Sequence, residues 1–309
     1  DHAEIRDYLK EVSERWGVRP HIRFDTAVTE AAFDEDSSRW TLTLHDGSTH
    51  VFDAVIVAPG QLSNPSIPPV EGRGSFAGEQ FHSAEWDHTV DLTGKRVVVV
   101  GGGASTIQVV PAIADTAGHV TLVQRSPNWV VGKMDWAPSK AEKALGRRVP
   151  LFLRAYHNVM WWWFESRYPL VLRSANPIRT IWERILRRHI AKVLDDPAKA
   201  AACTPDYPLG CNRILLSSEW YETLARPDVG VVRATASRME PDGLVLEDGT
   251  RLEADVIVWC TGFTPSRYTA PMEVRGRGGQ SLLDRWSDGP EAYLGMMTPG
   301  FPNMFMVYG

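Results

Sequence analysis

Residues 95–114 read KRVVVVGGGASTIQVVPAIA, and this stretch decides the fold. Four consecutive valines, Val97 to Val100, predict a strand that is buried on both faces, as in a parallel sheet. A glycine loop follows, and Ile107 to Ala114 continue as a predicted helix. A second apolar run, Val120 to Val123, predicts the next strand. This order is that of a dinucleotide-binding unit, so we expect an α/β protein with a Rossmann-like domain.

The glycine loop carries the first set of predicted cofactor-binding residues. Gly101 permits a tight turn, and Gly103 lets the backbone approach a pyrophosphate held at the helix N-terminus. Thr106 replaces the third glycine of the usual fingerprint, and it should push the helix outward slightly without removing the anion site. The predicted dinucleotide contacts at this loop are Gly101, Gly103, Ala104, Ser105, Thr106 and Gln108.

Arg125 ends the second predicted strand, where an NAD-binding protein carries Asp or Glu for the ribose hydroxyls. A guanidinium suits the 2′-phosphate of NADPH instead, and Ser126 follows it directly. The alternative is that Arg125 is a solvated charge at the end of a strand. Its position relative to the glycine loop favours NADPH as the cofactor.

Two segments on either side of this unit resemble each other. Residues 42–60 and 244–262 each contain alternating leucines, an Asp-Gly pair, an apolar strand and a final glycine. In both copies the Asp of that pair lies 7 positions before a second Asp, which lies 7 before the glycine. Asp-Gly predicts a tight hairpin turn. Such hairpins are common, so chance is the alternative, but the shared spacings favour an internal duplication.

The duplication implies that residues 42–60 belong to a second nucleotide-binding domain. That domain should have its own strand and glycine loop upstream. Residues 1–60 contain only Gly17, Gly47 and Gly60, and they open with a predicted amphipathic helix. We therefore expect the first domain to be incomplete and the chain to be an interior piece of a longer protein.

Composition excludes several classes of protein. With 309 residues, 43% hydrophobic and 23% charged, the chain is globular, and its length fits about two domains of roughly 150 residues. A net charge of −5 without a basic block argues against a nucleic-acid partner. Cys203, Cys211 and Cys260 give neither CxxC nor zinc spacing, so no metal is expected. The absence of a signal-peptide pattern and of a disulfide framework favours a reducing, cytoplasmic location.

Residues 76–87 read FAGEQFHSAEWD and match the pattern F-x-G-x-x-x-H-x-x-x-W-[PD] at every fixed position. On this pattern the chain resembles the Baeyer–Villiger monooxygenases, which are FAD- and NADPH-dependent flavoproteins related to the flavin-containing monooxygenases. The resemblance implies that the segment links two nucleotide domains and shifts during turnover. A structural linker with a satisfied histidine is the alternative. The fixed positions are Phe76, Gly78, His82, Trp86 and Asp87.

Other segments are similar to the same family. Residues 58–60 and 260–263 stand where its members carry Ala-Thr-Gly turns, which implies cofactor contacts for Gly60, Thr261 and Gly262. Both copies depart from the family pattern by one residue.

Two further loops resemble the NADPH-binding parts of the family. Residues 123–129 look like its 2′-phosphate loop. Residues 209–213 resemble a segment whose Lys-Arg pair grips the phosphate and reaches the flavin. Here Asn212 replaces the lysine, and Arg213 is retained.

The resemblance implies a reaction. NADPH reduces FAD, the reduced flavin captures O2 as a C4a-peroxide, and one oxygen is inserted into a ketone to give an ester or lactone. Arg213 is then the catalytic candidate, because a guanidinium stabilises developing negative charge. A surface arginine is the alternative.

Two other functions stay open. A flavin-containing monooxygenase would oxidise the nitrogen or sulfur of a small substrate, and a non-catalytic NADP-binding module would hold no FAD. The chain alone is expected to be inactive. The sequence indicates neither the substrate nor the oligomeric state.

We expect three parts: residues 1–90 as the end of the first FAD-domain segment and a linker, 91–265 as the NADP-binding domain, and 266–309 as the return to the FAD domain. A helical insertion is expected at about residues 135–215 of the second part.

This insertion is unusually aromatic, with Trp161 to Trp163 in a row. Arg154, Glu165, Arg167 and Arg173 interrupt its apolar run, which is too short for the roughly 20 residues that cross a bilayer. In order of preference, the tryptophans belong to a packed helical insertion, to the wall of a substrate pocket, or to a peripheral membrane contact. No membrane partner is therefore expected.

Overall fold

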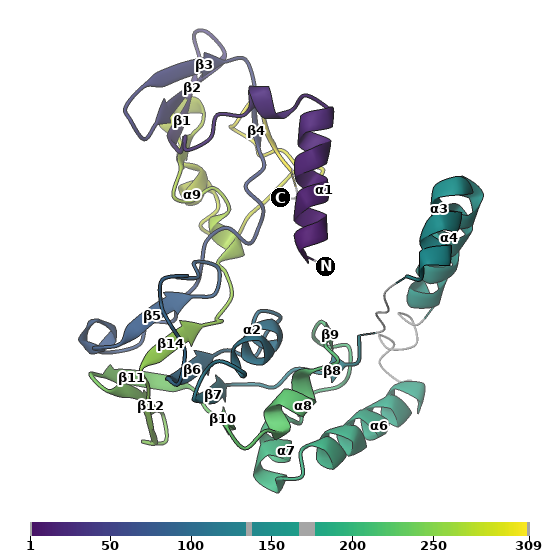
Figure 1. Ribbon diagram of the computed structural model, residues 1–309. Coiled ribbons are helices and arrows are strands. Elements are labelled where there is room, and N and C mark those ends of the chain that lie inside the picture. The colour runs from purple at the N-terminus through teal and green to yellow at the C-terminus, as the bar shows by residue number, and fades with distance from the viewer. Residues whose placement is uncertain (1, 134–137, 167–176, 308–309) are drawn as a thin grey trace. The chain divides into compact units, whose positions relative to one another are not determined.

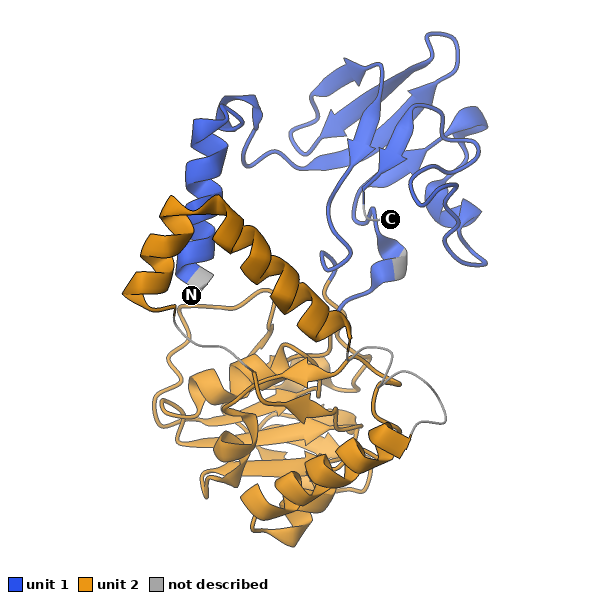
Figure 2. Cartoon of the chain, turned by 90° about the vertical axis from the view of Figure 1, so that its right-hand side faces the viewer, with its two compact units in different colours: residues 1–64, 263–309 blue, residues 65–262 orange. Residues whose placement is uncertain are grey.

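The computed structural model describes residues 2–133, 138–166 and 177–307, which form two compact units. The first unit consists of residues 1–64 and 263–309, and the second of residues 65–262 (Figure 2). The chain therefore passes between the units twice. Arg167, Arg173 and the first residues of the expected insertion, 135–137, lie outside the described residues.

The second unit is built on a five-stranded sheet in the order β10-β7-β6-β14-β5, with all neighbouring strands parallel (Figure 1). Its strands are β5 (Glu79–His82), β6 (Arg96–Val100), β7 (His119–Gln124), β10 (Val229–Arg233) and β14 (Val256–Trp259). A three-stranded antiparallel sheet is formed by β11 (Ala236–Glu240), β12 (Gly243–Leu246) and β13 (Arg251–Glu253). The helices are α2 (Thr106–Ile113), α3 (Lys140–Arg148), α4 (Pro150–Glu165), α6 (Pro177–Val193), α7 (Pro197–Cys203) and α8 (Trp220–Ala225). The short strands β8 (Val130–Val131) and β9 (Leu215–Leu216) pair parallel to each other.

Successive valines of β6 pack into different cores. Val97 and Val99 pack with residues of α2, α6 and α8, whereas Val98 and Val100 pack with residues of β12 in the antiparallel sheet. This alternation follows from the two-residue period of a strand. The unit therefore has three layers: helices, the parallel sheet and the small antiparallel sheet. The predicted Rossmann-like strand, glycine loop, helix and strand are confirmed.

The order of the strands places the glycine loop at a topological switch. The chain continues from β6 to β7 and then β10 on one side, whereas β14 lies on the other side of β6. Ligands of open α/β sheets bind at the carboxyl ends of the strands where the order reverses in this way. The glycine loop leaves β6 at this point.

The first unit contains a four-stranded sheet in the order β15-β1-β2-β3 and a parallel pair, β16-β4. Its core includes Trp40, whose Nε1 donates to the carbonyl oxygen of Pro302 at 2.8 Å. Its strands are β1 (Val28–Asp34), β2 (Arg39–Leu44), β3 (Thr49–Phe52), β4 (Val55–Val57), β15 (Glu273–Arg275) and β16 (Met304–Met306), and its α-helices are α1 (His2–Arg15) and α9 (Leu282–Arg285).

The two copies of the internal duplication have the same backbone geometry. In each hairpin an N–H donates across the turn at 2.9 Å, from Leu44 to Ser48 and from Leu246 to Thr250. The turn glycines, Gly47 and Gly249, have φ values of 82° and 84°. These matches, 202 positions apart, confirm the two predicted hairpins. The duplication itself stays a prediction.

Each copy then continues into a parallel strand, and three residues after the strand a glycine has positive φ, 77° at Gly60 and 81° at Gly262. The strands differ in burial. All of β14 is buried, but Ile56 in β4 is exposed, since β4 pairs only with β16 among the described residues. The expected burial on both faces therefore applies to the second copy alone.

The boundary between the units also differs from the expected one near residue 90. Residues 65–90 belong to the second unit. The reason is β5, which pairs with β14 from Glu79 opposite Val256 to His82 opposite Trp259.

Candidate functional site

The glycine loop begins where β6 and β14 come very close. A Cβ on Gly101 would lie 2.2 Å from the carbonyl oxygen of Cys260, and its φ of 138° disfavours other residues. The Gly101 N–H donates to the carbonyl oxygen of Val123 at 2.9 Å. Gly101 therefore serves both the predicted turn and the contact between adjacent strands.

Gly103 faces open space, since a Cβ there would meet no atom within 4 Å. Helix α2 begins three residues later. The side chain of its N-cap residue, Ser105, accepts no hydrogen bond from the first backbone N–H groups of the helix. Backbone N–H groups at such a terminus are oriented toward an anion. Thr106 is buried, whereas Gln108 is exposed and its Nε2 donates to the carbonyl oxygen of Ala104 at 2.8 Å. The loop therefore leaves open space at Gly103 in front of an uncapped helix start.

The loop after β7 is bound to the glycine loop. Asn128 Nδ2 donates to the carbonyl oxygen of Gly102 at 2.6 Å, and Tyr207 Oη donates to Asn128 Oδ1 at 2.8 Å. A Cβ on Gly102 would lie 2.9 Å from the carbonyl oxygen of Ser126. Arg125 and Ser126 are exposed beside this contact. The structure thus brings these two predicted residues to the glycine loop.

Residues 209–213 are held near the same loop by β8 and β9. The N–H of Leu215 donates to the carbonyl oxygen of Trp129 at 2.9 Å, and Trp129 Nε1 donates to the carbonyl oxygen of Tyr207 at 3.0 Å. Asn212 and Arg213 are exposed immediately before β9. The two loops that resemble NADPH-binding segments, residues 123–129 and 209–213, therefore lie in the same unit and are connected through Trp129.

Asn128 and Tyr207 are site residues that the sequence did not single out. Asn128 lies within the loop that resembles the phosphate-binding segment, but the contact from Tyr207 comes from 79 positions away. The only local signal was the position of Asn128 three residues after Arg125.

The fingerprint segment forms the edge strand of the parallel sheet. Phe76 is buried, and a Cβ on Gly78 would lie 2.4 Å from the carbonyl oxygen of Asp255. Trp86 packs edge-on against Phe81, with ring centroids 4.9 Å apart. The glycine and the aromatic residues of the fingerprint therefore fix this segment to the sheet.

His82 is 1% exposed at the end of this strand. Its Nδ1 accepts the N–H of Ala84 at 3.1 Å, and the backbone of Gly262 lies close to its ring. Burial lowers the pKa of the imidazole, which the Gly262 contact opposes in part. His82 is therefore a neutral, hydrogen-bonded group.

Asp87 ends the fingerprint in a turn of its own. Its Oδ1 accepts the N–H of Thr89 at 2.8 Å and the Thr89 hydroxyl at 2.6 Å. These bonds lower the pKa of the carboxyl group. Asp87 orders the chain that leaves the edge strand.

The Thr261-Gly262 turn is bound to the chain where the second unit begins. The Thr261 hydroxyl donates a hydrogen bond to the carbonyl oxygen of Ser66. In return, the Ser66 N–H donates to the carbonyl oxygen of Gly262. In the first unit, the carbonyl oxygen of Gly60 accepts the Ser63 hydroxyl at 3.1 Å. Both glycine turns therefore have defined local structure.

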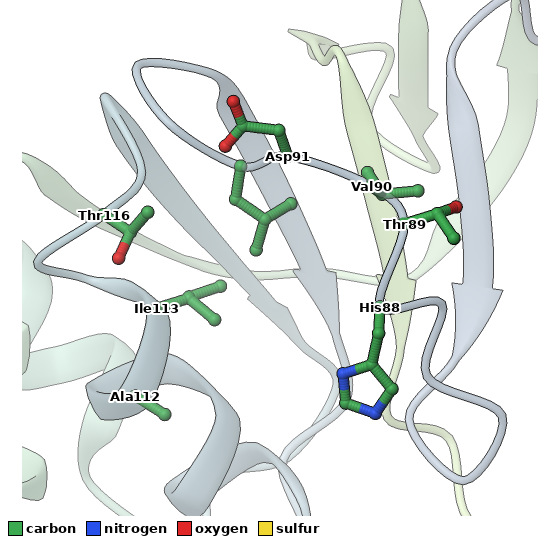
Figure 3. A pocket seen from close by; sticks show the side chains of 8 residues that line it. His88, Thr89, Val90, Asp91, Ala112, Ile113 and Thr116 are labelled. Carbon is green, nitrogen blue, oxygen red and sulfur yellow. The ribbon is translucent and has the colours of Figure 1, made fainter.

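A pocket of about 450 Å³ lies elsewhere in the second unit (Figure 3). It is lined by residues 88–92 and by Ala112, Ile113 and Thr116, at the C-terminal end of α2. The glycine loop lies at the opposite end of that helix, so this pocket is separate from the dinucleotide site. Among the described residues no cluster of three or more His, Cys, Asp or Glu could hold a metal ion.

Comparison with known proteins gives one family and several close relatives. Residues 1–168 match the model of the family described as flavin-binding monooxygenase-like. A protein of Streptomyces coelicolor named Baeyer-Villiger monooxygenase is 41% identical over 305 residues, which are 99% of this chain and 58% of that protein. The chain thus spans less than two thirds of that relative's length.

Two solved structures are similar over nearly the whole chain. Cyclohexanone monooxygenase from Rhodococcus sp. Phi1 bound to NADP+ has a TM-score of 0.83 at 28% identity, covering 98% of this chain and 64% of that one. The structure of OTEMO in complex with FAD and NADP has a TM-score of 0.85 at 30% identity, covering 98% and 65%.

Proposed function

The chain belongs to the flavin-binding monooxygenase-like family, and we propose that the protein containing it is a Baeyer–Villiger monooxygenase that inserts one oxygen of O2 into a ketone. The similarity to a relative of that name supports this activity. The observation that carries the proposal is the fingerprint segment, whose strand β5 pairs with β14 and ends at the buried His82. The activity belongs to the longer protein, because the chain spans 58% of that relative.

We assign the second unit to NADPH and the first unit to part of the FAD-binding domain. When bound, NADPH supplies a hydride, and FAD supplies the centre that activates O2. The open space at Gly103 and the uncapped start of α2 fit a pyrophosphate, with Ala104, Ser105, Thr106 and Gln108 around it. This fit comes from the backbone, so it does not depend on the missing third glycine.

Arg125 and Ser126 would bind the 2′-phosphate that distinguishes NADPH from NADH. Their exposure and the anchoring of their loop to Gly102 through Asn128 support this role. Asn212 stands where the family that this segment resembles has a lysine. Its amide would therefore add a neutral hydrogen bond rather than a charge. Arg125 then supplies the main cationic contact.

Arg213 is the residue that we assign to catalysis. It is exposed three residues after the Leu209-Gly210 turn, in a loop held by Leu209, whose N–H donates to Glu183 Oε1 at 2.8 Å. A permanently charged guanidinium stabilises negative charge that develops on the reacting oxygen. Turns at Gly60, Thr261 and Gly262 would let the backbone approach the cofactors.

Product analysis of the full-length protein tests the proposal. With NADPH and air, we expect a cyclic ketone to give the lactone, and the reaction should be faster with NADPH than with NADH. Sulfoxide from a thioether with no lactone from the ketone would assign heteroatom oxidation instead. The 309-residue chain is the control, since it should bind NADPH and form neither product.

A further inference from the structure

The loop that carries Arg213 is held at both of its ends. At its start, the Leu209 N–H donates to Oε1 of Glu183 at 2.8 Å. At its end, the Leu215 N–H donates to the carbonyl oxygen of Trp129 at 2.9 Å. Leu209 and Trp129 are both buried, so these two contacts lie inside the unit. Arg213 therefore lies between two fixed points of the backbone.

The start of this loop is a tight turn that needs an acceptor from elsewhere in the chain. The Cys211 N–H donates to the carbonyl oxygen of Pro208 at 3.2 Å, and Gly210 has a φ of 92°. This pattern is that of a β-turn with glycine at its third position. The Leu209 N–H belongs to the second residue, so the turn itself gives it no acceptor. A buried N–H without an acceptor is unfavourable, and the Glu183 carboxylate supplies one.

Glu183 comes from helix α6, which lies beside α7 and α8 (Figure 1). Arg179, one turn earlier, forms an ion pair with the Glu183 carboxylate at 3.5 Å, and the two side chains are 18% and 20% exposed. Arg187, one turn later, places its guanidinium over the Trp129 ring, 5.1 Å from Cζ to the centroid. Residues 179, 183 and 187 are four positions apart and share one face of the helix. This face of α6 therefore supports both anchors of the loop.

The same contacts connect the loop to the dinucleotide site. Trp129 Nε1 donates to the carbonyl oxygen of Tyr207, and Tyr207 Oη donates to Asn128. Asn128 in turn donates to the carbonyl oxygen of Gly102. The position of the loop relative to the glycine loop therefore depends on buried contacts that α6 supports.

We propose that Glu183 is a positioning residue for Arg213, which it places by fixing the turn at residues 208–211. This inference rests on the proposed function, in which the Arg213 guanidinium stabilises negative charge on the reacting oxygen. Glu183 acts through the backbone of the loop, 30 positions away in the sequence. A displacement of a reacting or stabilising group by about 1 Å can cost about 100-fold in rate. The turn therefore matters for the rate and not only for the fold.

Kinetics of the full-length protein test the proposal. Glu183→Leu removes the acceptor, and kcat for lactone formation should fall by about tenfold or more, with unchanged KM for the ketone and unchanged Kd for NADPH. More of the NADPH consumed should yield hydrogen peroxide, because its two electrons then reduce O2 without oxygenating the ketone.

Two further variants separate the lost contact from a general effect of substitution. Glu183→Gln keeps an oxygen that can accept the Leu209 N–H, so it should restore most of the rate. Glu222→Leu makes the same change at an exposed position of α8, and it is the matched control that should keep the full rate.

Hydrogen exchange in the 309-residue chain measures the anchor without flavin or ketone. Residues 207–216 should exchange about tenfold faster in Glu183→Leu than in the unchanged chain or in Glu183→Gln. Exchange in β6 and β14 should stay the same, which shows that the fold is intact. If circular dichroism shows Glu183→Leu to be unfolded, Glu183→Ala makes the same test with a smaller side chain.

Three results would each overturn the proposal: full kcat in Glu183→Leu, an equal loss of kcat in Glu183→Gln, or unchanged exchange at residues 207–216. No lactone from the unchanged full-length protein would contradict the proposed function instead. The exchange experiment would then still decide whether Glu183 fixes the loop.

Discussion

His82, at the end of the fingerprint strand, is 1% exposed, and its Nδ1 accepts the N–H of Ala84 at 3.1 Å. Because Nδ1 accepts the N–H of Ala84, the proton of the neutral ring lies on Nε2. The imidazole also lies close to the backbone of Gly262, so one side chain stands beside both the edge strand and the turn after β14. We propose a positioning role for the fingerprint histidine, since burial lowers its pKa and keeps the ring neutral at neutral pH.

The stability of the chain should depend on pH through His82. Burial holds the folded pKa below the ordinary 6.5, so the unfolded state binds more protons as the pH falls below that value. The free energy of unfolding should therefore be highest above pH 6.5 and fall as the pH drops toward the folded pKa. Urea unfolding at several pH values measures this slope.

His82→Gln should remove this contribution to the slope and cost about 1–3 kcal/mol at neutral pH, because the buried hydrogen bond from the Ala84 N–H to the ring is lost. His88→Gln is the control, because His88 is exposed. An unchanged pH slope in His82→Gln would contradict the assignment of a buried neutral ring.

Gly101→Ala should destabilise the fold. The new Cβ would meet the Cys260 carbonyl oxygen at 2.2 Å, and a φ of 138° is strained for alanine. Both β6 and β14 are central strands, so neither can shift freely. We expect a loss of about 2–4 kcal/mol in the free energy of unfolding, measured with urea. A loss below about 1 kcal/mol would show that the strands can separate.

Gly103→Ala should behave in the opposite way. Its Cβ would meet no protein atom within 4 Å, so the melting temperature should change little. The methyl group would occupy the space that we assign to the pyrophosphate, and NADPH binding should weaken by about tenfold or more. Calorimetric titration with NADPH measures this effect. Normal affinity in Gly103→Ala would place the pyrophosphate elsewhere.

The dinucleotide unit could be predicted because its signals are local. Val97 to Val100, the glycines after them and Val120 to Val123 are continuous in the sequence, and each specifies its own strand, turn or helix. The hairpins of the duplication were predictable for the same reason, since an Asp-Gly pair determines the turn by itself.

The features that could not be predicted from the sequence depend on residues that are far apart in the chain. Strand β5 reads EQFH, which has no alternation or β-branched residue, and it is a strand because it pairs with β14 about 180 positions later. The contact of Tyr207 with Asn128 is also long-range.

Arg125→Ala should change cofactor preference without changing stability. The side chain is exposed beside the glycine loop, and a charge-assisted contact to the 2′-phosphate would be lost. We expect about tenfold or more weaker NADPH binding and unchanged NADH binding in the 309-residue chain. Arg6→Ala, on α1, is the control. Equal losses for both nucleotides would indicate a pyrophosphate contact instead.

Arg213→Ala in the full-length protein should abolish oxygenation but leave NADPH binding intact. Loss of one positioned charge near a developing oxyanion costs about 10²–10³ in rate. We expect the positive charge of the side chain to matter more than its shape, so Arg213→Lys should be more active than Arg213→Ala. Cys211→Ala, at an exposed position two residues earlier in the same loop, should retain the full rate.

Lactone formation and NADPH consumption are measured separately, since an enzyme that still oxidises NADPH without forming lactone keeps its cofactor sites. Ester or lactone formation at the normal rate in Arg213→Ala would remove this residue from the mechanism.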